Sequence, residues 1–399
     1  LPFYTGNNGG WSRNYEYSSN PIAIVHFTDD KRKTYQTFGN AYAEYAFLRD
    51  KSLRFRTNLG ADISFAHNKN FAQNFGDDND NDPAELYPGQ GRNNRPNNLD
   101  ENFGEAFTFT FTNTLNYAKT LAGRHNINVL LGTESISLRT SGIGGSRQNF
   151  DNSTPPFRYL DYGSDVNKNS AGSATEWNLV SFFGSAGYSF ENKYFVNGTL
   201  RADGSSRFGP NNRWGYFPSV SGAWRISQES FMQNVSWLDD LKLRASWGQA
   251  GNQEIPDKAY ETLVSQVGGV VNIVRYGNPD IRWETTSQTD IGFELSALRN
   301  KLSFTADYFN KKTSDILLAV GLPAVSVGVI APTYVNAGEV TNKGLEFSLG
   351  YQNRDRAFKY GVNANLSTVT NRVDKLQTFV KNIIDDATHT RTVVGQPIS

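Results

Sequence analysis

The sequence predicts an all-β protein, an antiparallel transmembrane β-barrel with about twelve strands in this chain. Three observations support this fold class. Apolar and polar residues alternate along most of the 399 residues, short and long connections alternate between the expected strands, and helical periodicity is scarce. The chain also lacks a run of about 18 apolar residues, which a transmembrane helix would need, whereas a barrel strand needs apolar residues at only every second position.

The expected strands are recognised by apolar residues at alternate positions. In the clearest, from Lys51 to Phe65, Leu53 and Phe55 share one face while Arg54 and Arg56 take the other. The remaining strands are expected near residues 38–48, 107–117, 127–131, 180–188, 194–200, 220–226, 241–247, 291–295, 302–308, 345–351 and 358–366. The faces opposite the apolar ones carry small and polar residues.

The connections between these strands follow a regular rhythm. Short turns are expected at 49–51, 121–123, 191–193, 299–301 and 353–356, with a slightly longer one at 227–240. Long connections alternate with them, at 67–104, 139–175, 251–285 and 311–342, with a shorter one near 204–213. Outer-membrane barrels have this pattern because tight turns face the periplasm and longer loops face outward. A soluble sandwich, which buries its apolar faces against each other, has no such requirement.

Aromatic residues flank the short turns. Phe190 and Tyr194 lie on either side of one turn, and Tyr351, Phe358 and Tyr360 surround another. This placement predicts an interfacial girdle, in which the ring faces lipid and the polar tip faces water. The alternative is that Tyr and Phe simply favour strands.

Charge and motif content exclude several functions. The 39 Lys and Arg residues balance 39 Asp and Glu residues and are spread along the chain, so nucleic-acid binding is not expected. There is no cysteine, and the four histidines do not form a zinc motif. No Walker A, G-x-G-x-x-G or G-x-S-x-G motif supplies a phosphate site or a nucleophile. We therefore expect no enzyme and assign no catalytic residue.

Several stretches resemble one family closely. They are residues 200–209 (LRADGSSRFG), 212–219 (NRWGYFPS), 224–227 (WRIS), 241–253 (LKLRASWGQAGNQ), 278–284 (NPDIRWE) and 336–346 (NAGEVTNKGLE). Asn20-Pro21 and residues 38–42 are also similar to it. Together these stretches resemble the SusC/RagA family of TonB-linked outer-membrane transporters.

The resemblance implies a larger assembly than this chain. Such a transporter has a barrel of about 22 strands, an N-terminal plug, a segment that contacts TonB, and a SusD-like lipoprotein over its outer end. On this basis residues 1–399 are expected to be the central part of the barrel domain, with the plug and the terminal strands absent. The implied function is TonB-dependent import of an oligosaccharide or peptide through the outer membrane, with TonB, a SusD-like lipoprotein and outer-membrane lipid as partners.

Arg201, Asp203 and Arg207 form the first candidate site. Alternation places Arg201 and Asp203 on the face that lines the lumen, and Gly204-Ser205-Ser206 has the composition of a tight turn. One hypothesis is that these charges bind a ligand. The other is that they pair with one another and brace the hairpin, as lumenal charges commonly do.

Asp78, Asp80 and Asp82 form a second candidate site, within the acidic run 77–82. Their D-x-D-x-D spacing is typical of oxygen-rich Ca²⁺ loops. However, Pro83 stands where an EF-hand needs glycine, and Gly89 stands where it needs a bidentate glutamate. A solvated loop without Ca²⁺ is therefore the alternative, and no other cofactor is expected.

Aromatic residues within the long connections are candidate contacts for a substrate or a partner lipoprotein. They are Trp11, Tyr87, Phe157, Tyr159 and Tyr162. Each could stack on a sugar ring or contact a partner, or could pack within its own loop.

Two other functional classes remain as alternatives to the importer. One is a secreted β-rich glycan-binding protein, and the other is a closed twelve-stranded membrane barrel with hydrolase or secretion activity. The second would need a Ser–His pair at one strand end, which the sequence does not supply. The location of the apolar faces, against lipid or against each other, separates the first from a membrane barrel.

Overall fold

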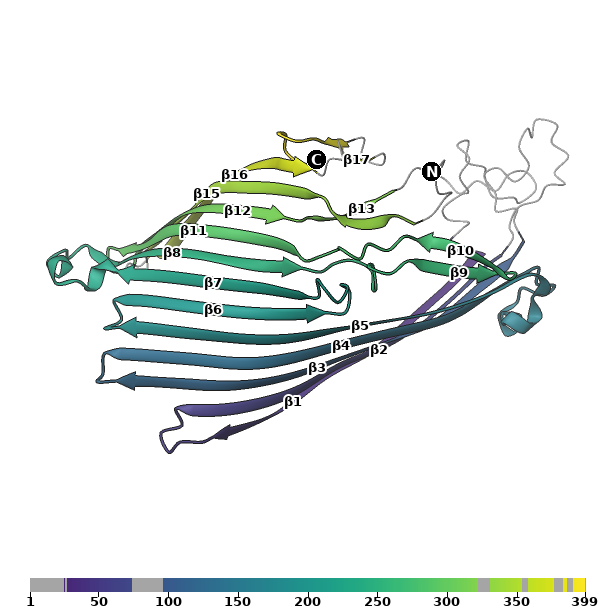
Figure 1. The fold of residues 1–399 in the computed structure, drawn as a ribbon, viewed down its shortest axis with the longest axis horizontal. Helices are drawn as coiled ribbons and strands as arrows, with labels where there is room; N and C mark the ends of the chain where they lie inside the picture. Colours follow the sequence, from purple (N-terminus) through teal and green to yellow (C-terminus); the bar gives the residue numbers. More distant parts are fainter. Residues whose placement is uncertain are drawn as a thin grey trace. The chain divides into compact units, whose positions relative to one another are not determined.

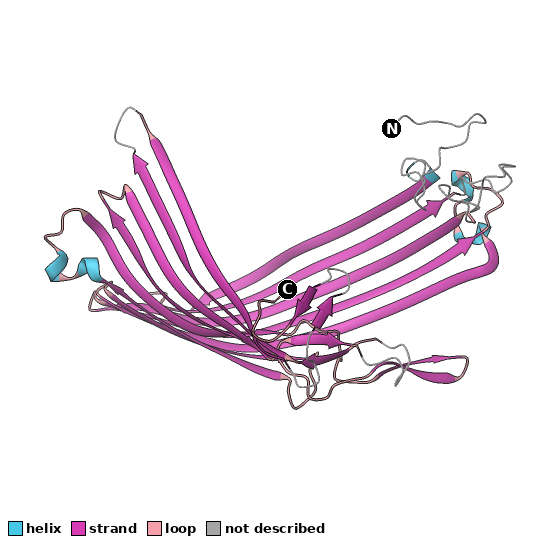
Figure 2. Ribbon diagram, turned by 90° about the horizontal axis from the view of Figure 1, so that it is seen from above, coloured by secondary structure: helices cyan, strands magenta, loops and turns pink. Residues whose placement is uncertain are grey.

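The computed structural model describes residues 25, 27–73, 96–321, 331–353, 358–376, 383–385 and 390–398. Strands make up most of this part of the chain (Figure 2). Among the described residues, four one-turn 3-10 helices lie in the connections: η1 (Pro155–Phe157), η2 (Leu160–Tyr162), η3 (Ile226–Gln228) and η4 (Ser230–Met232). In the described residues, no helix has the length and the apolar character needed to cross a membrane.

Within the described ranges, twelve strands form one sheet in which each strand pairs with the next main strand along the chain (Figure 1). They are β1 (Thr28–Ala46), β2 (Leu53–Ala72), β3 (Asn98–Leu121), β4 (His125–Gln148), β5 (Ser164–Phe190), β6 (Tyr194–Ser205), β7 (Trp214–Arg225), β8 (Leu238–Asn252), β11 (Glu284–Ala297), β12 (Leu302–Ser314), β15 (Gly338–Asn353) and β16 (Tyr360–Leu376). The predicted all-β class and the number of strands are confirmed.

In the described part of the chain, three small hairpins lie outside the main sheet. They are β9 (Leu263–Val267) with β10 (Val270–Arg275), β13 (Leu317–Val320) with β14 (Thr333–Asn336), and β17 (Ile383–Asp385) with β18 (Thr390–Thr392). The first hairpin belongs to the connection between β8 and β11, and the second to the connection between β12 and β15. Two of the predicted long connections are thus partly ordered as strands of their own.

Several strands are longer than predicted. The expected connection at 139–175 is wrong over most of its length, because β4 continues to Gln148 and β5 begins at Ser164. Likewise, β2 runs to Ala72 and β3 begins at Asn98, within the expected connection 67–104. The segment from Ser164 to Glu176 carries mostly polar residues on both faces. It therefore lacks the alternation of apolar and polar residues from which a strand is predicted. Strand pairing needs only backbone donors and acceptors, which every non-proline residue supplies.

The chain divides into two compact units. The first comprises Leu1–Asn40, Gly60–Phe109 and Ser137–Glu176, and the second Ala41–Leu59, Thr110–Ile136 and Trp177–Ser399. Each unit contains a small buried apolar cluster. In the first unit Phe71, Leu99 and Phe150 are buried together, and the cluster of the second unit is described below.

The two faces of the sheet differ in chemistry. Ile291 lies opposite Tyr308, which in turn lies opposite Leu345, and all three side chains are more than a third exposed. The same face continues through Leu349 to β16, where Leu366 is 62% exposed. A soluble sandwich would bury this face, whereas a membrane barrel turns it toward lipid. The exposed apolar face agrees with the predicted membrane barrel.

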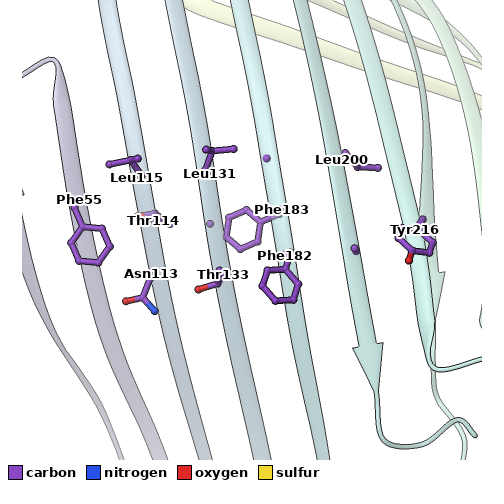
Figure 3. A pocket seen from close by; sticks show the side chains of 13 residues that line it. Phe55, Asn113, Thr114, Leu115, Leu131, Thr133, Phe182, Phe183, Leu200 and Tyr216 are labelled. Carbon is purple, nitrogen blue, oxygen red and sulfur yellow. The ribbon is translucent and has the colours of Figure 1, made fainter. Parts of the chain in front are cut away.

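A shallow apolar depression lies on the same face in the second unit. Side chains from neighbouring strands line it, among them Phe55, Leu115, Leu131, Phe182 and Leu200 (Figure 3). Asn113 and Thr133 are among its few polar lining side chains. Because it is open and almost wholly apolar, this depression is suited to contact with lipid chains rather than to specific binding.

The girdle predicted from the aromatic residues is visible beside the turn between β7 and β8. The rings of Tyr194 and Trp224 stack with their centroids 6.5 Å apart. The Tyr194 hydroxyl donates a hydrogen bond of 2.5 Å to Glu229 Oε1, and Trp224 Nε1 donates one of 3.1 Å to the same oxygen. The rings thus lie on the apolar face, with their polar atoms directed at a carboxylate in the turn. This is the arrangement that a membrane–water interface favours.

The assignment of the apolar face can be tested by inserting a charge. We expect Leu345→Arg, in the middle of β15 and on its exposed apolar face, to lower the free energy of unfolding in bilayers by about 2–4 kcal/mol, because an arginine far from both strand ends must be taken out of water. Ser348→Arg, on the opposite face of the same strand, is the control and should cost less than about 1 kcal/mol. Urea titration of a full-length receptor carrying this chain in vesicles measures both. Equal losses would contradict the assignment.

A pH dependence should follow from the girdle. The hydrogen bonds from Tyr194 and then Trp224 hold the pKa of Glu229 below its ordinary value of 4.5. Since the folded pKa is depressed, the contribution to stability is present above pH 4.5 and is lost as the pH falls through the lowered pKa. Glu229→Gln should reduce this acid-induced loss, measured by unfolding titrations at several pH values. Glu254→Gln, at an exposed carboxylate in a loop, should leave it unchanged.

Candidate functional site

A first ionic cluster lies on the polar face at the end of β6. Arg201 Nε donates to Asp203 Oδ1 at 2.7 Å, and its Nη2 donates to Glu134 Oε1 at 3.0 Å and to Ser181 Oγ at 2.8 Å. The guanidinium carbon lies 5.4 Å from the centroid of the Phe183 ring. Asp203 is 8% exposed and Ser181 is fully buried. One arginine therefore joins three strands, β4, β5 and β6.

Arg207 does not join this cluster. It forms ion pairs with Asp257 at 3.2 Å and Glu254 at 3.3 Å, and its Nη1 donates to the Gln253 carbonyl. Its guanidinium lies over the Trp177 ring at 5.0 Å. The structure thus separates the three predicted residues into two groups, because β6 ends at Ser205 and Arg207 follows in the connection. Arg201 and Asp203 brace the strands, and Arg207 anchors the connection after β8.

A second ionic cluster on the same face was not identified from the sequence. Arg244 Nη2 donates to Asp307 Oδ2 at 2.7 Å, and Arg244 Nε lies 3.1 Å from Glu294 Oε1. Gly292 lies opposite both Arg244 and Asp307 in the register. A Cβ at that glycine would lie 1.9 Å from Asp307 Oδ1, so only glycine leaves room for the pair. The sequence does show that Arg244, Glu294 and Asp307 occupy polar positions of their strands. Which of these side chains meet depends on the strand register, which the sequence alone does not supply.

The buried apolar cluster of the second unit, here termed the loop cluster, lies where the connections leave the sheet. It consists of Leu179, Phe208, Phe217, Ile255, Ala259, Ile281 and Trp283. The Trp283 ring lies 5.1 Å from Phe208 and 5.4 Å from Phe217, centroid to centroid. Its indole N–H donates to the Arg213 carbonyl at 2.9 Å. Burial and this hydrogen bond together fix the position of a large aromatic residue.

The loop cluster brings together four of the six stretches that resembled one family. Phe208 comes from 200–209, Phe217 from 212–219, and Ile281 and Trp283 from 278–284. The stretch at 336–346 joins through Asn336, which accepts from the Arg282 N–H at 2.9 Å and donates to the Arg282 carbonyl at 2.7 Å. These stretches therefore build one packed structure at the strand ends.

The candidate contact residues lie partly within the described chain. Trp11 and Tyr87 lie outside the described residues. Phe157, Tyr159 and Tyr162 are in the connection between β4 and β5, and all three are more than a third exposed. Phe157 and Tyr162 pack edge to face, 5.2 Å apart, and the Lys69 ammonium lies 4.1 Å over the Tyr159 ring. These three aromatic side chains thus pack within their own unit and also keep a surface that a substrate or partner could contact.

The candidate Ca²⁺ ligands Asp78, Asp80 and Asp82 also lie outside the described residues. In the part of the chain that the structure describes, no group of three His, Cys, Asp or Glu side chains converges as a metal site would require. On the polar face, Asp203, Glu134, Glu294 and Asp307 are engaged by arginine.

A single sheet with an exposed apolar face, a charged opposite face and aromatic residues at the turn end defines an outer-membrane β-barrel protein. The chain belongs to the TonB dependent receptor-like, beta-barrel family, whose model matches residues 2–397. The resemblance to SusC/RagA transporters and the outer-membrane location are confirmed.

Relatives cover most of this chain. TonB-dependent receptor P3 of Formosa agariphila is 31% identical over 388 residues, which are 92% of this chain and 36% of that receptor. TonB-dependent receptor SusC of Bacteroides thetaiotaomicron is 26% identical over 389 residues, 93% of this chain and 36% of SusC. The solved RagAB peptide transporter matches with a TM-score of 0.84 at 26% identity, covering 98% of this chain and 43% of that chain. The chain thus spans about a third of the length of the two curated relatives.

The bracing role of Arg201 can be measured with a double-mutant cycle of Arg201→Gln and Asp203→Asn in a full-length receptor. Loss of Arg201 leaves a nearly buried carboxylate without its cation, so we expect a coupling free energy of about 1–3 kcal/mol in unfolding. The Arg54–Glu44 pair, 3.7 Å apart with both side chains more than a third exposed, is the control. Its coupling should stay below about 1 kcal/mol. Equal coupling in both cycles would refute the bracing role.

Proposed function

We propose that this chain forms part of the wall of an outer-membrane importer that takes up a nutrient too large for ordinary porins, an oligosaccharide or a peptide. The observation that carries the proposal is the division of one sheet into an exposed apolar face and a face with paired charges. In a membrane barrel, the apolar face contacts lipid and the charged face lines a hydrated interior, so both faces have a role. The relatives are receptors and transporters, which supports a role in uptake without chemistry.

The ionic clusters on the polar face give this wall a fixed surface. Arg201 and Arg244 each engage two carboxylates from more than one strand, so these side chains are held in place by ion pairs. A wall with fixed, hydrated side chains can keep its shape while a plug domain moves against it. Energy would come from TonB acting on a plug domain, as the family relationship suggests.

The loop cluster has a different role, at the outer rim. Its buried tryptophan and the reciprocal hydrogen bonds between Asn336 and Arg282 hold the connections after β8 and β12 in a defined arrangement. We propose that this rim docks a SusD-like surface lipoprotein, which delivers the substrate. The relationship to the RagAB transporter supports a two-component assembly.

The exposed aromatic residues are candidate contacts within this scheme. Phe157, Tyr159 and Tyr162 could present ring faces to a sugar or to the lipoprotein. Trp11 and Tyr87 stay predictions of the same kind. A Ca²⁺ site at Asp78, Asp80 and Asp82 likewise stays a prediction.

Uptake by whole cells tests the function. Deletion of the gene should abolish uptake of a labelled oligosaccharide or peptide mixture above the porin size limit, and the intact gene should restore it. Collapse of the proton-motive force should have the same effect as deletion, because TonB transmits that energy. Uptake of a monosaccharide is the control and should not change. Equal uptake of large substrates with and without the gene would contradict the proposal.

A further inference from the structure

The apolar face changes character within the first unit. On β2, alternate positions on one face run from Ile63 and Phe65 to His67 and Lys69. On β3, the positions on the same face as Phe107 include Glu105 and Glu101. Such a change from apolar to charged side chains marks the level at which hydrocarbon gives way to lipid headgroups. The outer parts of β1 to β4 therefore have a lipid-facing side that extends into the headgroup layer.

An apolar groove lies at this level. Its volume is about 620 Å³, and Tyr35, Phe65, Phe103 and Ile143 line it from four successive strands. Each of these side chains is almost half exposed or more. The His67 ring stacks on Phe103 with centroids 4.0 Å apart, and its Nε2 lies 2.8 Å from Glu101 Oε1. The groove thus has an apolar floor and a polar border on one side.

A cationic pocket adjoins that border. It has a volume of about 220 Å³, and its cations are Lys31, Lys33, Lys69 and Arg158. It shares Lys33 and His67 with the apolar groove, so the two spaces lie next to each other. Tyr159 and Phe71 form its apolar lining, the first beneath the Lys69 ammonium and the second beneath the Arg158 guanidinium.

The charges around this pocket do not cancel. Asp29 pairs with Lys31 at 2.8 Å and with Arg158 at 2.9 Å, and Glu101 lies 3.5 Å from the Lys69 ammonium. Four cations thus face two carboxylates, an excess of two positive charges (4 − 2) without counting His67. Lys33 makes no ion pair with any described residue. This pocket is complementary to an anion with more than one negative charge.

We propose that the groove and the pocket together bind a phosphorylated lipid of the outer leaflet, with an acyl chain along the groove and a phosphate among Lys33, Lys69 and Arg158. A free phosphate would have no use for the adjoining apolar groove. The site is on the lipid-facing side of the strands, where a membrane lipid is always present. The lipid would hold the outer ends of these strands at a defined height in the membrane.

Binding of lipid A to a full-length receptor carrying this chain tests the proposal. The receptor is purified in detergent, stripped of lipid and titrated, with native mass spectrometry as the readout. The probes are phosphorylated lipid A, the same lipid after enzymatic removal of its phosphates, and inorganic phosphate. The test variants are Lys33→Gln with Lys69→Gln, and Lys33→Glu alone, which changes an exposed residue. The control is Arg32→Gln with Lys168→Gln, which removes two cations outside the pocket.

We expect phosphorylated lipid A to bind about tenfold more tightly than the dephosphorylated lipid, a difference of about 1.4 kcal/mol, because cations near an anionic headgroup attract it. Both test variants should lose this preference, and the control should keep it. Heat-modifiable migration on gels verifies that each variant is folded. Equal binding of the two lipids, unchanged binding by Lys33→Glu, or inorganic phosphate binding as tightly as lipid A would each overturn the proposal.

Discussion

The architecture of this chain depends on one constraint, that backbone donors and acceptors in hydrocarbon must be paired within the protein. Each unsatisfied group would cost several kcal/mol, roughly. Consecutive strands that pair in order meet this requirement without loops crossing the membrane interior. Because paired strands send successive side chains to opposite faces, the same constraint imposes the alternation that runs through the sequence. The apolar face and the charged face are therefore two consequences of one arrangement of the backbone.

The charged face shows how such a sheet is stiffened where lipid does not touch it. Arg201 and Arg244 each connect residues of neighbouring strands, and glycine at position 292 provides the room for one of these ion pairs. Ion pairs of this kind contribute modestly to stability but fix side-chain geometry when both partners are partly buried. These two clusters therefore present charges to the interior that are held in ion pairs.

The sequence was sufficient for the strand count and for the faces, because alternation is a local signal. The sequence did not predict the outer strand ends. Residues 164–176 are mostly polar on both faces, so this part of the strand has no alternating pattern of apolar residues. From the sequence, Arg207 was also grouped with Arg201. In the structure β6 ends between the two residues, and Arg207 forms an ion pair with Asp257 instead. The loop cluster could not be derived, because Phe208 and Trp283 are 75 residues apart and their contact depends on how the connections fold.

The stretches that identify the family are mainly structural. Phe208 and Ile281 are fully buried and Trp283 is 8% exposed, so these side chains present almost no surface to a substrate. Their resemblance to relatives therefore reports a shared scaffold for the rim and not a shared substrate. Substrate choice is expected to depend on exposed residues of the connections, such as Phe157 and Tyr162, which are both more than a third exposed. Because surface side chains contribute little to the fold, they can change between relatives while the buried rim is kept.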